Sequence, residues 1–152
     1  MSLRTPLLLA GLLWSLLVPF HDAAAANDVG VVKTARGAAT VERAGQRLPA
    51  SVGTKVREGD VVVTGADGSV GITFGDNSLL SLGPDSRLTI DRYAFDATTH
   101  RGAFETSLNK GTLTGVSGKI ARQSPGAMKV RTPAALLGVR GTEFAIRTGD
   151  PQ

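Results

Sequence analysis

The segment Asp67–Asp91 reads DGSVGITFGDNSLLSLGPDSRLTID and repeats a pattern every nine residues. Each unit opens with a turn at Asp67, Asp76 or Asp85 and continues into a run with apolar residues at alternate positions. Aspartate and asparagine favour such turns because their side chains hydrogen-bond nearby backbone amides and tolerate unusual φ values. Alternation with a period of two places the apolar residues on one face of a strand. The segment therefore predicts three short strands that bury Val70, Ile72, Phe74, Leu80, Leu82, Leu88 and Ile90.

The rest of the chain extends this pattern to an all-β fold with little helix. Short alternating runs lie between turn residues, and no window of eleven residues has a clear helical stripe. We expect strands on both sides of a turn at Arg36-Gly37, a loop over residues 93–102, and strand again over residues 103–121. A unit of nine residues fits either an antiparallel meander or a compact coil resembling a β-helix. The period alone does not distinguish these two topologies.

A second informative stretch, TPAALLGVRGTEFAI, runs from Thr132 to Ile146. Pro133 predicts the end of a strand, because proline has no amide to give to a central ladder. The following AALLG predicts one helical turn with Gly138 as its C-cap, and TEFAIRT predicts the last strand. Arg140 lies between glycines in this apolar segment, where we expect it to act as an internal clamp that hydrogen-bonds several backbone carbonyls. The alternative is that its planar fork binds a carboxylate or phosphate ligand.

The N-terminus has the layout of a secretory signal peptide. Arg4 precedes an apolar run from Pro6 to Phe20, and small residues follow as a cleavage site. We expect residues 1–26 to be removed, residues 27–148 to form a single domain and residues 149–152 to be a short tail. The 152-residue chain has no cysteine, which rules out disulfides and thiolate metal sites. These features predict a periplasmic or extracellular protein without a transmembrane span in its mature form.

The formal net charge of +4 suits an envelope partner that is anionic, either a polymer or a lipid headgroup. Nucleic acid is not an expected partner, because the basic residues are spread singly and aromatic residues are few. The sequence does not indicate an oligomeric state.

No set of residues predicts catalysis, and we expect a protein that is not an enzyme and holds no cofactor or metal. His100 is the only histidine after the signal peptide, and it lies in a polar loop without a second candidate ligand. The nine-residue spacing of the aspartates matches calcium-binding repeats, but the G-G-x-G-x-D-x-U-x motif of those repeats is absent. The remaining carboxylates are isolated along the sequence, which leaves a hydrolase without support; they are Asp60, Asp91, Asp96 and Glu105.

The ordered set of turns resembles the FecR domain, a periplasmic β-domain named after the regulator of iron-dicitrate uptake. The resemblance covers about residues 56–146. Its marks are the turns before the predicted strands and the closing GVRGTEF stretch. The motif residues are Gly59, Asp60, Asp67, Gly68, Asp76, Asn77, Asp85, Arg140, Gly141 and Thr142.

The resemblance implies a compact all-β module of a kind that serves in envelope signalling, and it implies no catalytic residues. In founding members the domain belongs to a transmembrane regulator that links an outer-membrane siderophore transporter to a sigma factor. Five residues precede the hydrophobic segment here, so we expect a free-standing exported domain that binds or scaffolds an envelope protein or polymer. The alternatives are a cell-wall hydrolase or carbohydrate-processing enzyme, and a membrane-anchored signalling regulator of the siderophore-uptake type.

Overall fold

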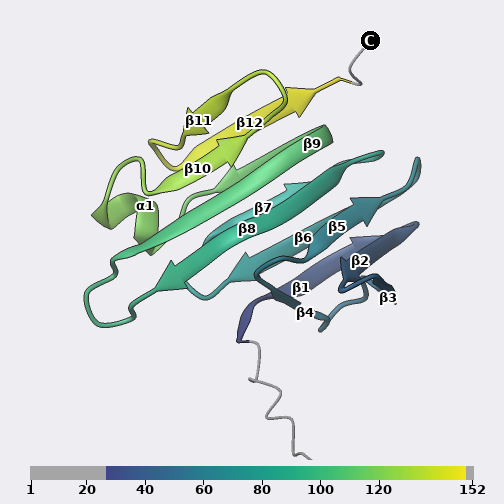
Figure 1. Ribbon diagram of the computed structural model, residues 1–152, viewed down its shortest axis with the longest axis horizontal. Helices are drawn as coiled ribbons and strands as arrows, with labels where there is room; N and C mark the ends of the chain where they lie inside the picture. Colours follow the sequence, from purple (N-terminus) through teal and green to yellow (C-terminus); the bar gives the residue numbers. More distant parts are fainter. Residues whose placement is uncertain (1–26, 150–152) are drawn as a thin grey trace, which may run out of the picture.

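The computed structural model describes residues 27–149. The predicted signal peptide and the last three residues of the predicted tail lie outside this range. The described part contains twelve strands and one short helix (Figure 1). In chain order these are β1 (Asp28–Arg36), β2 (Ala39–Arg43), β3 (Gln46–Pro49), β4 (Lys55–Arg57), β5 (Val61–Thr64), β6 (Ser69–Phe74), β7 (Leu79–Leu82), β8 (Arg87–Phe95), β9 (Gly102–Val116), α1 (Lys119–Gln123), β10 (Met128–Arg131), β11 (Leu136–Gly138) and β12 (Glu143–Thr148). The all-β prediction is confirmed.

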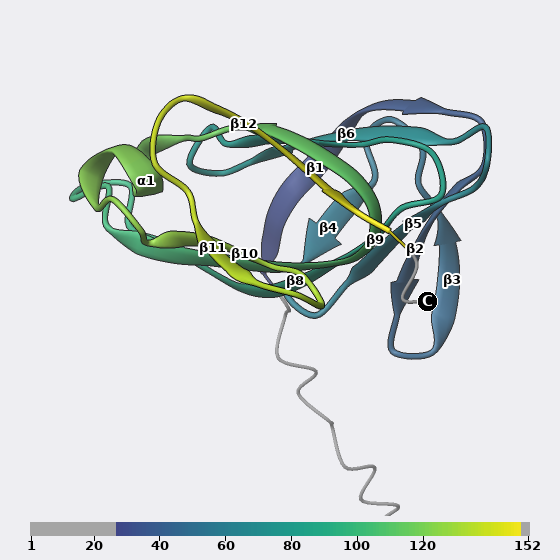
Figure 2. The ribbon, with the colours of Figure 1, turned by 90° about the horizontal axis from the view of Figure 1, so that it is seen from above.

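The strands form one curled sheet in the order β3-β2-β5-β8-β9-β7-β6-β1-β4. Its two halves face each other as two layers, and the long strand β9 passes from one layer to the other (Figure 2). The N-terminal part of β9 pairs with β8 from Gly102 to Lys110, and its C-terminal part pairs with β7 from Leu113 to Val116. β10 and β12 add to the two parts of β9, and β11 pairs with β10. All strand pairs are antiparallel except β9 with β10, so the repeats form antiparallel structure rather than a β-helix-like coil.

The predicted alternation decides which residues fill the space between the layers. Strand β6 alternates between half-buried and buried residues, and β7 alternates between exposed and buried ones. Leu79 breaks the apolar period and is 44% exposed, whereas Leu80 beside it is fully buried. Burial of apolar side chains is the main favourable term in folding, at about 25 cal/mol per Å². All seven core residues predicted from the repeat are buried, together with Phe104, Leu108, Leu113, Ile120, Met128 and Val130 from later elements.

The bend in β9 depends on Gly111, which has a φ of 93°. Such positive values are rare for residues with a side chain. A Cβ at this position would also collide with Ser86, whose hydroxyl bonds to both backbone groups of Thr112. The Thr112 N–H donates to Ser86 Oγ at 3.0 Å, and Ser86 Oγ donates to the Thr112 carbonyl at 3.3 Å. The turn between β7 and β8 therefore holds β9 where it changes layers.

Three local predictions are wrong. Residues Lys119–Gln123 form α1 instead of continuing a strand, and Ile120 from this helix enters the core. The stretch AALLG contains β11, which pairs with β10, where a helical turn was expected. Strand β8 continues to Phe95, so the loop begins later than residue 93. In all three places long-range pairing or capping decides the backbone, which a local pattern does not contain.

Candidate functional site

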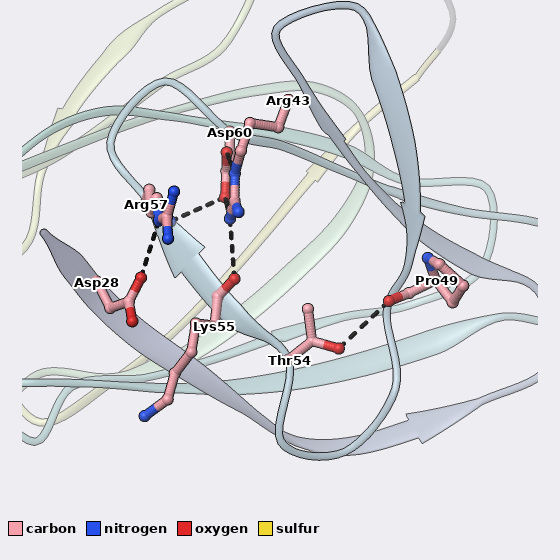
Figure 3. Close-up of polar contacts among 7 residues, drawn as sticks. All are labelled: Asp28, Arg43, Pro49, Thr54, Lys55, Arg57 and Asp60. Atoms are coloured by element: carbon pink, nitrogen blue, oxygen red, sulfur yellow. Dashed lines mark hydrogen bonds and ion pairs between the residues drawn. The ribbon is translucent and has the colours of Figure 1, made fainter. Parts of the chain in front are cut away.

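The carboxylate of Asp60 lies buried at the turn between β4 and β5, where only 1% of the residue is exposed (Figure 3). Arg43 donates two hydrogen bonds to this carboxylate, from Nε to Oδ1 at 2.8 Å and from a terminal nitrogen to Oδ2 at 2.6 Å. The backbone N–H of Arg57 donates a third bond to Oδ2 at 2.8 Å. The hydrogen bonds that Arg43 donates to Asp60 raise the pKa of Arg43 above its ordinary value. Two-point pairing of this kind orients both groups, and both carboxylate oxygens of Asp60 accept internal hydrogen bonds.

The same cluster joins distant parts of the chain. Arg43 also donates to the carbonyl of Lys55 at 2.9 Å, which ties the end of β2 to β4 (Figure 3). The side chain of Arg57 pairs with Asp28 at 2.9 Å on the surface, and the N–H of Gly59 donates to the carbonyl of Ile90 at 2.7 Å. The predicted pair Gly59-Asp60 therefore lies in a turn whose hydrogen bonds connect β2, β4 and β8.

Asp76 forms a second buried cluster, at the turn between β6 and β7. Its carboxylate accepts bonds from the N–H and hydroxyl of Ser78, the hydroxyl of Tyr93 and the N–H of Ile120. Burial, followed by the charge of Asp76, raises the pKa of the Tyr93 hydroxyl well above its ordinary value. Gly118 N–H donates to Ser78 Oγ at 2.9 Å, and Lys119 N–H donates to the Asp76 carbonyl at 2.8 Å. The Asp76-Asn77-Ser78 turn thus satisfies the orphan amides at the start of α1.

The other two repeat aspartates lie at the opposite end of β6 and β7. Asp67 Oδ1 accepts from the N–H of Ala38 at 3.2 Å, and the N–H of Asp85 donates to the carbonyl of Gly65 at 3.0 Å. Gly68 is buried between Ala38 and Gly65. Because β6 and β7 are antiparallel, Asp76 is separated from the other two aspartates by the length of a strand. The described residues contain no group of three or more side chains that could hold a metal ion.

His100 lies in the turn between β8 and β9, with a φ of 57°. Its ring stacks on Phe95 at a centroid distance of 6.2 Å. The nearby Asp96 accepts backbone bonds from Thr98 and Thr99, which lower the pKa of this carboxylate. The carboxylate of Asp96 therefore holds the backbone of the turn that carries His100.

Arg140 is exposed, and its predicted position as an internal clamp is wrong. Its neighbour Val139 is the anchor of this segment: it is 6% exposed, and its N–H donates to the carbonyl of Met128 at 2.9 Å. Gly141 and Thr142 are held by Ser117, whose hydroxyl donates to the Gly141 carbonyl and whose N–H donates to the Thr142 carbonyl. Gly141 has a φ of 99°, which favours glycine, and Arg140 beside it is exposed between two anchored points, Val139 and Gly141.

A shallow hollow of about 530 Å³ lies on the outer face of β7, β9 and β12. We call it the outer hollow. Leu79, Ala145 and Val116 give it an apolar floor, and Glu143 provides a negative charge. Directly beneath, the ring of Phe144 covers Gly115 from the core side, because Phe144, Gly115 and Leu80 are register partners. The full lining is Leu79, Ser81, Thr114, Gly115, Val116, Glu143, Phe144 and Ala145.

A family model described as FecR protein matches residues 60–152. The chain belongs to the FecR family. No curated protein and no solved structure gives a significant match to the chain. Among the described residues of this FecR domain, no helix has the length and apolar character needed to cross a membrane.

The predicted motif residues of this FecR domain occupy separate corners of the fold and do not meet in one site. Asp60 and Asp76 are buried and fully engaged, Asp67 and Asp85 sit in surface turns, and Arg140 is exposed. Sequence reasoning identified the Asp76-Asn77-Ser78 turn but missed the distant partners Arg43 and Tyr93, since nothing in their local sequence marks them. It also missed the outer hollow, although the break in the alternation at Leu79 is a signal for it.

Proposed function

We propose that this FecR domain is an exported, non-enzymatic binding module that recognises an envelope protein in a signalling pathway. Family membership supports the coarser part of this statement, since FecR domains are modules of signalling-related regulators. The buried carboxylates support the non-enzymatic part of the proposal, because the side chains of Asp60 and Asp76 accept hydrogen bonds from within the domain.

The outer hollow is the observation that carries the binding role. Leu79 is one of few large apolar side chains exposed in the described residues, and an exposed apolar group in a hollow is typical of an interaction surface. Its negative group is Glu143, which disfavours an anionic polymer in this place. A protein segment with an apolar side chain and a basic residue fits the lining better. An anionic envelope polymer is the alternative partner, because the net charge of +4 would attract it to the domain as a whole.

The test is capture from envelope extract with the purified domain, residues 27–152, in three forms: unchanged, Leu79→Asp and Val52→Asp. Val52 is a matched control because it is 67% exposed in the turn between β3 and β4, away from the hollow. We expect one protein to be captured by the unchanged domain and by Val52→Asp and to be lost with Leu79→Asp. Equal capture by all three forms would contradict the assigned surface.

Two further assays address the alternative functions. Turnover of cell-wall polymers by the purified domain, abolished by His100→Ala, would support the hydrolase and overturn the non-enzymatic proposal. N-terminal sequencing of the exported protein decides between export and anchoring. We expect a start at or near Asn27, whereas an intact hydrophobic segment would support the anchored regulator.

A further inference from the structure

Strand β12 is an edge strand of the curled sheet. It pairs with β9 along its whole length from Glu143 to Thr148, and no other described strand pairs with it. It lies at the margin of the molecule beside β9 (Figure 1). An edge strand presents unpaired N–H and C=O groups, which natural proteins commonly protect with proline, bulges or inward-pointing charges. The register of β12 is continuous and contains no proline, so its free edge can accept another strand.

We propose that β12 pairs with β12 of a second copy of this chain, antiparallel and centred on Ala145. A symmetric antiparallel pair places residue i opposite residue j such that both copies make the same contacts. With Ala145 facing itself, Glu143 lies opposite Arg147 of the second copy, and Arg147 lies opposite Glu143 of the second copy. Opposite charges directly across an antiparallel pair stabilise it, whereas like charges destabilise it.

The side chains of β12 suit this register on both faces. Glu143, Ala145 and Arg147 are exposed and share the outer face, so the two ion pairs flank a small central residue. On the other face Phe144 and Ile146 are partly buried against the core, and each lies opposite the other in the second copy. The dimer would therefore continue both the charged face and the apolar face across the new strand pair.

Neighbouring registers lose this match. Centring the pair on Phe144 places Glu143 opposite Ala145, and centring it on Ile146 places Arg147 opposite Ala145. A shift by one residue on a single strand is excluded, because it moves every side chain to the other face. The charge pattern thus selects the register centred on Ala145, and it selects a second copy because one strand supplies both signs.

The decisive experiment measures self-association of residues 27–152 by sedimentation velocity over a range of concentrations into the millimolar region. The variants are Glu143→Arg, Arg147→Glu and the double variant Glu143→Arg/Arg147→Glu. Each single reversal creates two like-charge pairs, so we expect the dimer dissociation constant to rise at least about tenfold, equivalent to about 1.4 kcal/mol. The double variant restores opposite charges and should recover the original constant.

Lys33→Glu serves as the matched control, because Lys33 is exposed on β1, a strand that pairs with β4 and β6 and not with β12. Thermal melts of all variants report whether the fold is retained. Ala145→Cys gives a second measurement, since the chain has no other cysteine. A short bis-maleimide should link two copies through Cys at this position and should not link copies of Lys33→Cys.

A monomer at every concentration would overturn the proposal. So would a dimer that tolerates the single reversals, or a double variant that stays as weak as the single ones. Since these measurements use the purified domain alone, they succeed or fail independently of partner capture through the outer hollow.

Discussion

The carboxylate of Asp76 accepts a hydrogen bond at 3.3 Å from the backbone N–H of Ile120, a residue 44 positions later in the chain. Helix α1 has no side-chain cap of its own at Gly118. A turn between two strands supplies the cap instead, and Ile120, the second residue of α1, enters the core. This bond couples the nine-residue repeat to the segment that follows β9.

Asp76→Asn should lower the free energy of unfolding by about 1–3 kcal/mol, because an amide group cannot accept at both positions and its NH₂ group faces donors. Urea denaturation at neutral pH measures the change. Asp85→Asn is the matched control, because Asp85 is exposed in a turn with a φ of 50°, which asparagine tolerates. Equal stability of the two variants would show that the Asp76 bonds contribute little.

Arg43→Ala should cost about 2–3 kcal/mol, since it leaves the buried Asp60 carboxylate with only the Arg57 amide. Removing one partner of a fully buried ion pair costs about 3–5 kcal/mol. We expect a smaller loss here because 25% of the Arg43 side chain is exposed to solvent. Arg47→Ala, in a strand-edge pair with Glu42 at 3.3 Å and 78% exposed, should cost less than about 1 kcal/mol. The pairing is disproved as a stabilising contact if the two alanine variants unfold at the same urea concentration.

Gly115→Ala should destabilise the domain by about 1–3 kcal/mol, because the new methyl group would overlap the ring of Phe144 and force repacking. Adding Phe144→Leu should recover part of the loss. Gly138→Ala in β11 is the control, since a Cβ there meets its nearest atom, the Gly126 Cα, only at 3.9 Å. Additive effects of Gly115→Ala and Phe144→Leu would argue against the contact.

Val139→Ala should lower the melting temperature, with a loss of about 1–3 kcal/mol from the buried side chain. Arg140→Ala should leave it within experimental error, because the guanidinium is exposed. Differential scanning calorimetry of both variants makes the comparison. A marked loss for Arg140→Ala would restore the internal clamp predicted from the sequence.

Stability should fall as the solution becomes more acidic than the ordinary Asp96 pKa of 3.8. The backbone bonds from Thr99 and Thr98 hold the pKa of Asp96 below this value in the folded state, so the unfolded state binds the proton first. The stabilisation is complete above the unfolded pKa and is lost as pH drops through the folded pKa. Urea melts between pH 2 and 7 should show a shallower acid decline for Asp96→Asn, and identical slopes would contradict this assignment.

The alternation in the repeat was sufficient to predict the fold class and the buried residues from Val70 to Ile90. These features depend on period and turn chemistry, both of which are local. The antiparallel topology was not predictable in the same way, since a nine-residue period fits two architectures. The antiparallel meander, rather than the β-helix-like coil, follows from β9, which pairs antiparallel with β8 along one part and with β7 along the other.

The failures have a common physical cause. Arg140 was expected inside because of its apolar neighbours, but Val139 takes the buried position and Arg140 beside it is exposed. Helix α1 forms where Asp76 caps it from a distant turn. The outer hollow needs three strands that are separated in sequence, so a single residue, Leu79, was the only local trace of it.

The central claim is that the family motif builds the scaffold and the outer hollow binds the partner. The most direct test is the affinity of the captured envelope protein for Leu79→Asp and Arg140→Ala, measured by isothermal titration calorimetry. We predict a loss of at least about tenfold, or 1.4 kcal/mol, for Leu79→Asp and a change of less than about twofold for Arg140→Ala. The opposite result, with Arg140 essential and Leu79 dispensable, would contradict the account and make the arginine fork the ligand-binding group.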